Sequence, residues 1–434
     1  MMEFDGQRKL EFSAPETIKA VQEELLRRHL QYLADHSPYY RPLFKAGGID
    51  PATVTLDSLK RLPLTDKAAL SQHNDAFLAV PRSSIVDIVL SSGTTGRPTA
   101  MMYTDHDLRR LAYNEELSFE SCGMTRDDIV LLTCTIDRCF IAGLAYFSGV
   151  RSLGAAAIRN GLSSFESHLD IIQRLKPTAI VGVPTFLLKL GQFVQARGID
   201  PHQTGITKLI CIGEPVRDRS LTFLRVGEGL EAVWGAKVYS TYASSETITS
   251  FCECTAQQGG HLHPNLAVVE IVNEQGEVLP TGELGEVVVT PLAMEGMPLL
   301  RFKTGDMSFL INEPCSCGRQ SPRLGPIVGR KNHMIKFRGT TLYPNSIYAV
   351  LDSIPGISEY YVTATSDYDL SDIVQVTVAL KDNSCTAATI TERLQASLRV
   401  RPEVVIASEE HVKSQVYTGN SRKLIRFMDK RKSL

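Results

Sequence analysis

Between about residues 84 and 245, the chain alternates short apolar runs with segments of different character, and this alternation limits the fold more than any other feature. The apolar runs SIVDIVL, TAIVGVP and ITKLICIG lead into a hydroxyl-rich loop, TFLLKLGQFVQARG and EPVRDRSLTFLRVG, respectively. Strands that alternate with helices favour a parallel sheet covered by helices. The sequence therefore predicts an α/β layer, with helices at 185–198 and 214–227.

The flanking segments have other patterns. The first 80 residues predict mostly helix, because PETIKAVQEELLRRHLQYLADH places apolar residues three and four positions apart. After about residue 265, short alternating runs separated by turn residues predict antiparallel hairpins or a small barrel. A connector follows at 312–332, and the runs beyond it predict a helix, two strands and a helix.

A chain of 434 residues is too long for one ordinary core, so more than one domain is expected. We predict an N-terminal domain at 1–330, with a β-rich subdomain at about 265–311, and a C-terminal domain at 331–434. The net charge of −2 provides no bulk field that would favour nucleic acid or a membrane surface as partner.

The sequence also favours a cytoplasmic location. The first residues, MMEFDGQRKLEF, lack the apolar core of a signal peptide. The most membrane-like stretch, residues 129–147, contains Asp137 and Arg138, and these charges favour a buried core segment over a membrane span. An odd number of cysteines, nine, argues against a disulfide framework in such a chain. A cytoplasmic enzyme or binding protein is therefore expected.

The loop SSGTTGRPTA at 91–100 combines hydroxyl residues, glycines and a proline. Backbone N–H groups of a glycine-rich turn can form a concave anion site, and hydroxyls add uncharged donors. The loop lacks the lysine-ending pattern of a Walker A motif. Taken alone, it fits a phosphate-binding turn or a solvated surface turn.

Five segments in order, SSGTTGRPT, GEPVR, YASSE, RFKTGD and GRKNHMIKFRG, resemble the adenylate-forming superfamily of acyl-CoA synthetases and adenylation domains of peptide synthetases. The resemblance runs from about residue 80 to the C-terminus. The GRPT ending, the segment CSCGRQSPRLGPIVGR and the short chain are similar to the phenylacetate-CoA ligase branch. This implies a large N-terminal domain of α/β layers plus a small β-barrel, followed by a small mobile α+β C-terminal domain.

The resemblance implies two half-reactions. A carboxylate attacks the α-phosphorus of ATP, giving an acyl-adenylate and pyrophosphate, and a thiol, usually that of coenzyme A, then displaces AMP. Positioning and charge neutralisation can carry the phosphorus step without a protein nucleophile. The implied cofactors are ATP, Mg²⁺ and coenzyme A as co-substrate.

The resemblance also assigns nucleotide-binding roles. The β- and γ-phosphates would bind to Ser92, Gly93, Thr94, Thr95 and Gly96, and the α-phosphate to Ser245. Mg²⁺ would bind to Glu246. Adenine would contact Tyr242 and the turn Gly213, Glu214 and Pro215, and the ribose would contact Asp306 and Arg330. Ala243 and Ser245 replace a glycine and a threonine that are usual in the family. Glu246 also fits an ordinary surface carboxylate.

Three further roles concern the small domain. Lys423, ahead of an R-x-x-D ending, would bridge the acyl oxygen and the α-phosphate, although its basic surroundings also fit a solvated tail. Asn332 stands at the hinge, where most relatives have aspartate, and rotation at this point is expected to survive. Gly339 would line the thiol tunnel.

Six soft or borderline metal ligands occur in two groups, with Cys252, Cys254, His261 and His263 in the first and Cys315 and Cys317 in the second. Such a set can supply a tetrahedral zinc site. The branch shows a similar pattern that selects Cys254, His261, Cys315 and Cys317. Cys252 and His263 remain alternatives, and the implied role of the zinc is structural.

The resemblance places the carboxylate pocket near Phe140, Gly143, Tyr146, Phe147 and Phe186, which also fit ordinary core packing. An aryl or arylalkyl acid is the favoured substrate. The acceptor is coenzyme A, or alternatively a carrier-protein phosphopantetheine or another nucleophile. A non-catalytic nucleotide- or zinc-binding homologue is a further alternative, and a homodimer is expected by analogy with relatives.

Overall fold

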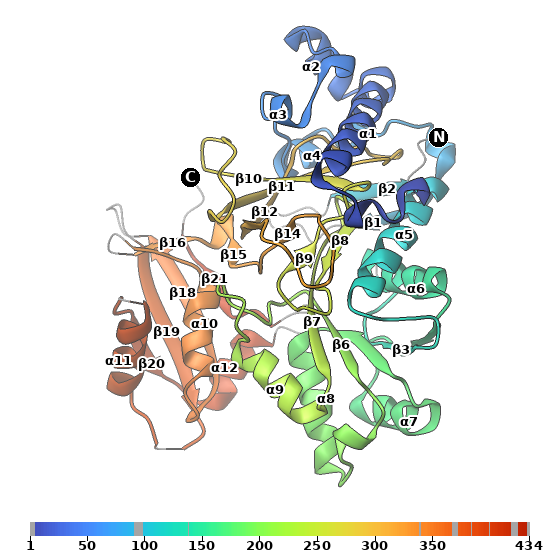
Figure 1. The fold of residues 1–434 in the computed structure, drawn as a ribbon. Coiled ribbons are helices and arrows are strands. Elements are labelled where there is room, and N and C mark those ends of the chain that lie inside the picture. The colour runs from blue at the N-terminus through green and yellow to red at the C-terminus, as the bar shows by residue number, and fades with distance from the viewer. Residues whose placement is uncertain are drawn as a thin grey trace. The chain divides into compact units, whose positions relative to one another are not determined.

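The computed structural model describes residues 5–90, 99–137, 139–337, 340–366, 372–382, 384–398, 400–417 and 424–431. The chain forms two compact units. The larger unit contains Met1–Thr304 and Ser308–Ile327, and the smaller contains Gly305–Met307 and Val328–Leu434. Figure 1 draws most of the smaller unit in orange and red. This confirms the mixed α/β class with a separate C-terminal domain, while the predicted boundary after residue 330 stays a prediction.

The helices begin and end as follows: α1 Pro15–His36, α2 Tyr40–Gly47, α3 Leu56–Leu59, α4 Lys67–Gln72, α5 Asp105–Ser121, α6 Ile141–Leu153, α7 Phe165–Leu175, α8 Pro184–Ala196, α9 Arg225–Trp234, α10 Pro344–Asp352, α11 Ala387–Leu398 and α12 Glu409–Val416. No described helix is long and apolar enough to cross a membrane.

The strands of the larger unit are β1 Ile85–Leu90, β2 Ala100–Thr104, β3 Ile129–Leu132, β4 Ala156–Arg159, β5 Ala179–Gly182, β6 Lys208–Ile212, β7 Lys237–Ser244, β8 Thr249–Cys252, β9 Gly260–His261, β10 Ala267–Val272, β11 Gly285–Pro291, β12 Phe302–Ser308 (shared with the smaller unit), β13 Leu310–Ile311 and β14 Arg323–Leu324. Those of the smaller unit are β15 Gly329–Arg330, β16 Ile335–Phe337, β17 Thr340–Leu342, β18 Ile357–Ser366, β19 Asp372–Leu380, β20 Glu403–Ile406 and β21 Phe427–Asp429.

A six-stranded sheet with order β4-β3-β5-β6-β7-β8 forms the centre of the larger unit. Its strands are parallel except β8, which is antiparallel to β7. Side chains alternate across the sheet: Ala179 and Val181 of β5 pack towards α5 and α6, whereas Ile180 packs towards α8 and α9. The helices cover both faces (Figure 1). The predicted parallel α/β layer is thus confirmed.

Two local predictions from the alternating region were wrong. Residues 214–224 are not helical, because Pro215 lacks an N–H and the carboxylate of Asp218 accepts hydrogen bonds from the N–H groups of Ser220 and Thr222, which favours turns. Helix α9 therefore begins only at Arg225. Strand β1 pairs with β2 in a separate antiparallel pair instead of joining the parallel sheet.

The region after residue 265 is rich in strands, as predicted. Strands β10 and β11 pair antiparallel over Ala267–Val272, and β12 lies next to β11. A second sheet has the order β13-β14-β9. Because β14 pairs with β9, the connector after residue 312 lies beside the segment that contains His261.

The smaller unit has the predicted order of helix, strand, strand and helix in α10, β18, β19 and α11. Its sheet has the order β20-β19-β18-β21. The helices α10 and α11 contribute Ile347 and Ile390 to one core, and α12 contributes Val412 to a second cluster. The last strand, β21, pairs parallel to β18, so residues 427–429 are part of this sheet.

Candidate nucleotide and metal sites

Part of the predicted site falls outside the described residues. This holds for Ser92, Gly93, Thr94, Thr95 and Gly96 of the hydroxyl-rich loop, for Gly339 and for Lys423. Their roles stay predictions. The other predicted residues can be placed individually within the two units.

Glu246 lies in the turn between β7 and β8, beyond the carboxyl end of the parallel strand β7. Its side chain is only 7% exposed, and Nζ of Lys67 lies 3.0 Å from Oε1. The hydroxyl of Ser244 donates to Oε2 at 2.9 Å. The carboxylate is therefore buried but neutralised, and its oxygens are of the kind that Mg²⁺ prefers. Lys67 is at the first position of α4 and belongs to no motif identified in the sequence.

Two buried side chains, Tyr103 and Arg110, bind backbone carbonyls near Glu246. The hydroxyl of Tyr103 donates to the carbonyl of Ser245 at 2.6 Å. The guanidinium of Arg110 donates to three carbonyls, those of Ile248, Leu266 and Leu292. Burial lowers the pKa of Arg110 to about 10. Both residues fix the backbone around Glu246, and neither was recognisable from a sequence motif.

The predicted adenine turn follows β6, at the same edge of the sheet as Glu246. Gly213 has a φ of 75°, a conformation that glycine adopts readily. The carboxylate of Glu214 accepts a hydrogen bond from the Thr185 N–H at 3.1 Å and another from the Thr185 hydroxyl at 3.0 Å. Thr185 is in the first turn of α8, where a carboxylate is favoured by the helix dipole. Tyr242 of β7 is half-buried and stacks against Phe251, with ring centroids 6.4 Å apart.

The two predicted ribose ligands lie together in the smaller unit. Asp306 of β12 is the cross-strand partner of Arg330 of β15. Nε of Arg330 lies 3.4 Å from Oδ1 of Asp306. The carboxylate is 17% exposed, and the arginine is 41% exposed. Asn332 lies two residues further on, in a single 3₁₀ turn, η7, at Lys331–His333.

A second candidate site is built by Cys254, His261, Cys315 and Cys317. The potential ligand atoms of these residues all lie within 4.8 Å of one another. Sγ of Cys254 is 3.5 Å from Sγ of Cys315, and Sγ of Cys317 is 3.3 Å from Nε2 of His261. The β14–β9 pairing holds the two halves of the cluster together. These are the four residues that the family resemblance selects.

The imidazole of His261 directs Nε2 towards the cysteines of the cluster and Nδ1 towards the backbone. Nδ1 of His261 lies 3.1 Å from the carbonyl of Ser321, so a proton on Nδ1 leaves Nε2 free to bind a metal. Burial lowers the pKa of His261 to about 4, which keeps the ring neutral. Three sulfurs and one imidazole nitrogen match a closed tetrahedral zinc site.

The two alternative ligands point elsewhere. Cys252 accepts a hydrogen bond from the Thr241 hydroxyl at 3.2 Å, within the core beneath α5 and α6. Nδ1 of His263 faces Oε2 of Glu11 at 3.5 Å, and its Nε2 lies 3.2 Å from the hydroxyl of Ser118. Neither side chain belongs to the compact set of four, and the choice of zinc ligands stays a prediction.

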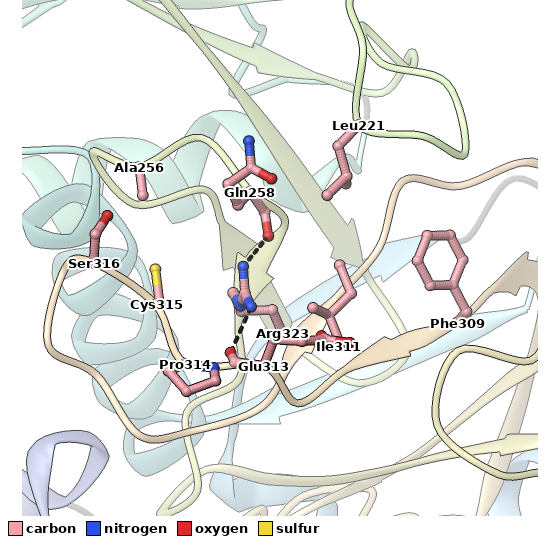
Figure 2. A pocket seen from close by; sticks show the side chains of 10 residues that line it. All are labelled: Leu221, Ala256, Gln258, Phe309, Ile311, Glu313, Pro314, Cys315, Ser316 and Arg323. Atoms are coloured by element: carbon pink, nitrogen blue, oxygen red, sulfur yellow. Dashed lines mark hydrogen bonds between the residues drawn. The ribbon is translucent and has the colours of Figure 1, made fainter.

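An open pocket of about 490 Å³ lies beside the cysteine cluster (Figure 2). Cys315 and Ser316 line one side, and Leu221, Phe309 and Ile311 line another. The guanidinium of Arg323 extends between the carbonyls of Gln258 and Glu313 and donates to each at 2.7 Å. Arg323 thus ties the connector to the strand region that follows Cys254.

Two of the predicted acyl-pocket residues, Tyr146 and Phe186, lie on opposite faces of the central sheet. Tyr146 is buried against Phe119, on the face of the central sheet covered by α5 and α6. Phe186 contacts Phe165 and His168 on the face covered by α8.

The other three residues lie in or beside α6. A Cβ at Gly143 would lie 2.1 Å from the Thr135 carbonyl, so glycine is required there by close backbone approach. The guanidinium carbon of Arg159 lies 4.9 Å from the ring centroid of Phe147. Phe140 precedes the first residue of α6 and is half-buried. The carboxylate pocket stays a prediction.

Comparison with known proteins matches both units. Residues 33–296 match the family model described as AMP-binding enzyme, and residues 339–431 match that of the AMP-binding enzyme C-terminal domain. Phenylacetate-coenzyme A ligase of Thermus thermophilus is 34% identical over 82% of this chain and 80% of its own length. The enzyme of the same name from Escherichia coli is 27% identical over 91% of this chain and 90% of its own length.

The fold is also found in solved structures. A crystal structure of 2-hydroxyisobutyryl-CoA ligase in the postadenylation state, in complex with R3-HIB-AMP, has a TM-score of 0.84 at 24% identity. The match covers 98% of this chain and 91% of that one. At this level of identity, the similarity concerns the fold alone.

Proposed function

The chain belongs to the AMP-binding enzyme family, and we propose that it is an ATP-dependent carboxylate–CoA ligase that acts through an acyl-adenylate. In the first step, a substrate carboxylate oxygen bonds to the α-phosphorus of ATP, and pyrophosphate leaves. In the second step, the thiol of coenzyme A attacks the acyl carbon, AMP leaves and the thiol proton is released to solvent. The products are acyl-CoA, AMP and pyrophosphate.

The observation that carries this proposal is the buried Glu246 at the carboxyl edge of the sheet. A carboxylate fixed by Ser244 and neutralised by Lys67 is suited to hold Mg²⁺ next to a polyphosphate. Mg²⁺ would supply charge neutralisation for the phosphates when bound. Glu214 and Tyr242 would contact the adenine side of the nucleotide, and Asp306 and Arg330 the ribose.

The preferred substrate is an aryl or arylalkyl carboxylic acid. Support comes from the relatives in Thermus thermophilus and Escherichia coli, both of which carry the name phenylacetate-coenzyme A ligase and match most of this chain.

The test is carboxylate-dependent exchange of labelled pyrophosphate into ATP, with a panel of aryl, arylalkyl and short aliphatic acids. Exchange with a ring-bearing acid is expected. The E246Q variant should lose exchange at least a hundredfold, because the Mg²⁺ ligand becomes neutral, whereas E274Q, which changes an exposed glutamate, should be unaffected. ATP binding without exchange for any acid would instead favour a non-catalytic homologue.

The acceptor is identified in a second assay with the acid found in the first. Formation of acyl-CoA from coenzyme A supports the proposal. Acyl transfer only to a carrier-protein phosphopantetheine, with free coenzyme A inert, would assign the chain to carrier loading.

We further propose that the four-residue cluster binds a structural Zn²⁺. The support is the fit of three sulfurs and Nε2 of His261 within 4.8 Å of one another, and the Ser321 carbonyl that orients the histidine. Four protein ligands would close the shell and exclude substrate. Elemental analysis of protein purified without chelator should give about one zinc per chain, and the C254S variant should give far less.

A cytoplasmic location and a homodimer belong to the same proposal. Cell fractionation tests the first. Sedimentation equilibrium tests the second, since a homodimer has twice the mass of the 47.9 kDa chain.

A further inference from the structure

A buried carboxylate of the smaller unit, Glu359 in β18, belongs to no site described above. Its side chain is only 6% exposed. Nε and Nη2 of Arg426 donate to its Oε1 at 3.0 and 2.8 Å, and the Tyr417 hydroxyl donates to its Oε2 at 3.1 Å. Tyr417 directly follows α12, and Arg426 directly precedes β21. One carboxylate therefore binds two residues that flank different elements.

The backbone brings the same two stretches together. The Ile425 N–H donates to the Val416 carbonyl at 3.1 Å. The Val362 N–H of β18 donates to the Arg426 carbonyl at 2.7 Å. Residues 416–417 and 425–426 thus lie side by side next to β18.

Lys423 stands between these two attachments. Residues 418–423 lie outside the described part of the chain, but the residues that hold the segment on either side are described. A segment whose two ends are held together has fewer conformations than one with a free end. This matters for a reacting group, because a displacement of about 1 Å can lower a rate about a hundredfold.

We propose that Glu359 is a positioning residue for the adenylation step. Its carboxylate ties Tyr417 to Arg426 and so fixes both ends of the segment that carries Lys423. This inference rests on the proposed function, in which Lys423 bridges the acyl oxygen and the α-phosphate. Because attack by the thiol does not use Lys423, loss of the Glu359 carboxylate should slow adenylation and leave thioester formation nearly unchanged.

The contacts around Arg426 separate this role from a general role in folding. Without the charge of Glu359, Nη1 of Arg426 keeps the Tyr360 hydroxyl as acceptor at 3.0 Å and Oδ1 of Asp352 at 3.9 Å. Strand β21 also keeps its parallel pairing with β18. What is lost is the connection between Tyr417 and Arg426. We therefore expect the E359Q variant to fold, with the ends of the segment held less firmly.

The test measures the two half-reactions separately in the full chain. Carboxylate-dependent pyrophosphate exchange reports adenylation, and acyl-CoA formation from supplied acyl-adenylate reports the second step. E359Q should lower the maximal rate of exchange about thirtyfold, with the KM values for ATP and the acid within twofold. Its rate of acyl-CoA formation should stay within twofold of the wild type. E410Q, which changes an exposed glutamate of α12, should alter neither step.

The Y417F variant removes only one of the bonds to Glu359. Tyr417 is 44% exposed, so the fold should tolerate the change, and exchange should fall about fivefold. The control is Y361F, which removes a hydroxyl that links β18 to α12 through His411 instead, and it should behave as the wild type. In a K423A background, neither E359Q nor Y417F should lower exchange further, because the group that they position is absent.

Three results would overturn the inference. The first is wild-type pyrophosphate exchange in E359Q. The second is an equal loss of both half-reactions with a lower Tm, since this would show a purely structural role. The third is a further loss of exchange when E359Q is added to K423A. A wild-type chain that shows no exchange with any acid would instead reject the proposed function itself, and this result is recognised before any substitution is made.

Discussion

Lys67 and Glu246 form an ion pair at the proposed nucleotide site. Removing one partner of a buried ion pair leaves the other charge uncompensated. Because the lysine side chain is 33% exposed, we expect K67M to lower the free energy of unfolding by only about 1–2 kcal/mol. We also expect Mg²⁺-ATP to raise Tm more in K67M than in the wild type, because the bound cation would replace the missing charge.

Thermal unfolding with and without Mg²⁺-ATP checks this expectation. The matched control is K208M, because Nζ of Lys208 lies 3.0 Å from the buried Asp128, at the opposite end of the parallel strands from Glu246. K208M should be destabilised without a larger response to Mg²⁺-ATP. An equal response in both variants would contradict a role of Lys67 at the nucleotide site.

Glu115 is a buried carboxyl group on α5 that no motif explains. It is 2% exposed, and Oε2 has no hydrogen-bond partner among the described residues. Burial raises its pKa from 4.5 to about 8. Between these two values the unfolded chain releases the proton and the folded chain keeps it, so stability falls as pH rises.

The E115Q variant removes this titration. Relative to the wild type it should gain stability by about 1.4 kcal/mol per pH unit between pH 5 and 8. Urea unfolding at several pH values measures the gain, with the exposed Glu392 changed to Gln as control. A stability difference that does not vary with pH would show that Glu115 titrates normally in the folded chain.

Single residues could be predicted from the sequence only where a motif marks them. Glu246, Asp306 and the cysteines of the cluster stand in recognisable segments. Lys67, Arg110 and Glu359 do not, because an isolated charged residue looks the same on the surface and in a buried network. Their partners lie far away in the sequence: Lys67 is 179 positions from Glu246, and Glu359 is 67 positions from Arg426. Only tertiary structure brings them together.

At the level of elements, apolar periodicity predicted the parallel strands and most helices correctly. It failed at 214–227, where Leu221, Phe223 and Leu224 have helix-like spacing but Asp218 closes a turn through its side chain. It also could not place β1, since an apolar run does not reveal which sheet a strand joins. The apolar periodicity of a segment contains no information about side-chain hydrogen bonds within a turn, or about which strand another strand pairs with.

The N-terminal segment around Glu11 binds Arg319 and Gln320, which closely follow two cysteines of the proposed zinc site, Cys315 and Cys317. The Gln320 N–H donates to the Glu11 carbonyl at 2.6 Å, and Arg319 binds the Glu11 carboxylate at 2.8 Å. Because Cys317 is two residues before Arg319, zinc removal should loosen both segments. We expect a chelator under reducing conditions to speed amide exchange at residues 5–12 and 313–321 by at least tenfold.

The C254S variant should show the same loosening without chelator, and C139S, at an exposed cysteine outside the cluster, should not. The β18 and β19 peptides of the smaller unit serve as an internal reference. Unchanged exchange at residues 5–12 after complete zinc removal would show that Glu11 and its partners hold this segment alone.

At the level of the whole molecule, the sequence predicted two bodies, because the patterns before and after the connector differ. In the structure, however, the smaller unit is not one continuous C-terminal segment. Gly305–Met307 belongs to the smaller unit, whereas the residues on either side of it belong to the larger unit. A strand shared in this manner cannot be predicted from a linear pattern. It places Asp306 beside Arg330, so both proposed ribose ligands are part of the same unit.

In the proposed reaction, the small domain takes part in both adenylation and thioester formation. A substitution in this domain can therefore slow one step without slowing the other. Lys423 is assigned to adenylation alone, so K423A should lower pyrophosphate exchange by at least a hundredfold. When the acyl-adenylate is supplied as substrate, however, K423A should form acyl-CoA at nearly the wild-type rate. Attack by the thiol does not require this lysine to neutralise charge at the α-phosphate. Exposed Lys413 of α12, changed to alanine, should affect neither step. Equal loss of both steps in K423A would show that the residue supports the fold of the small domain instead of the first reaction.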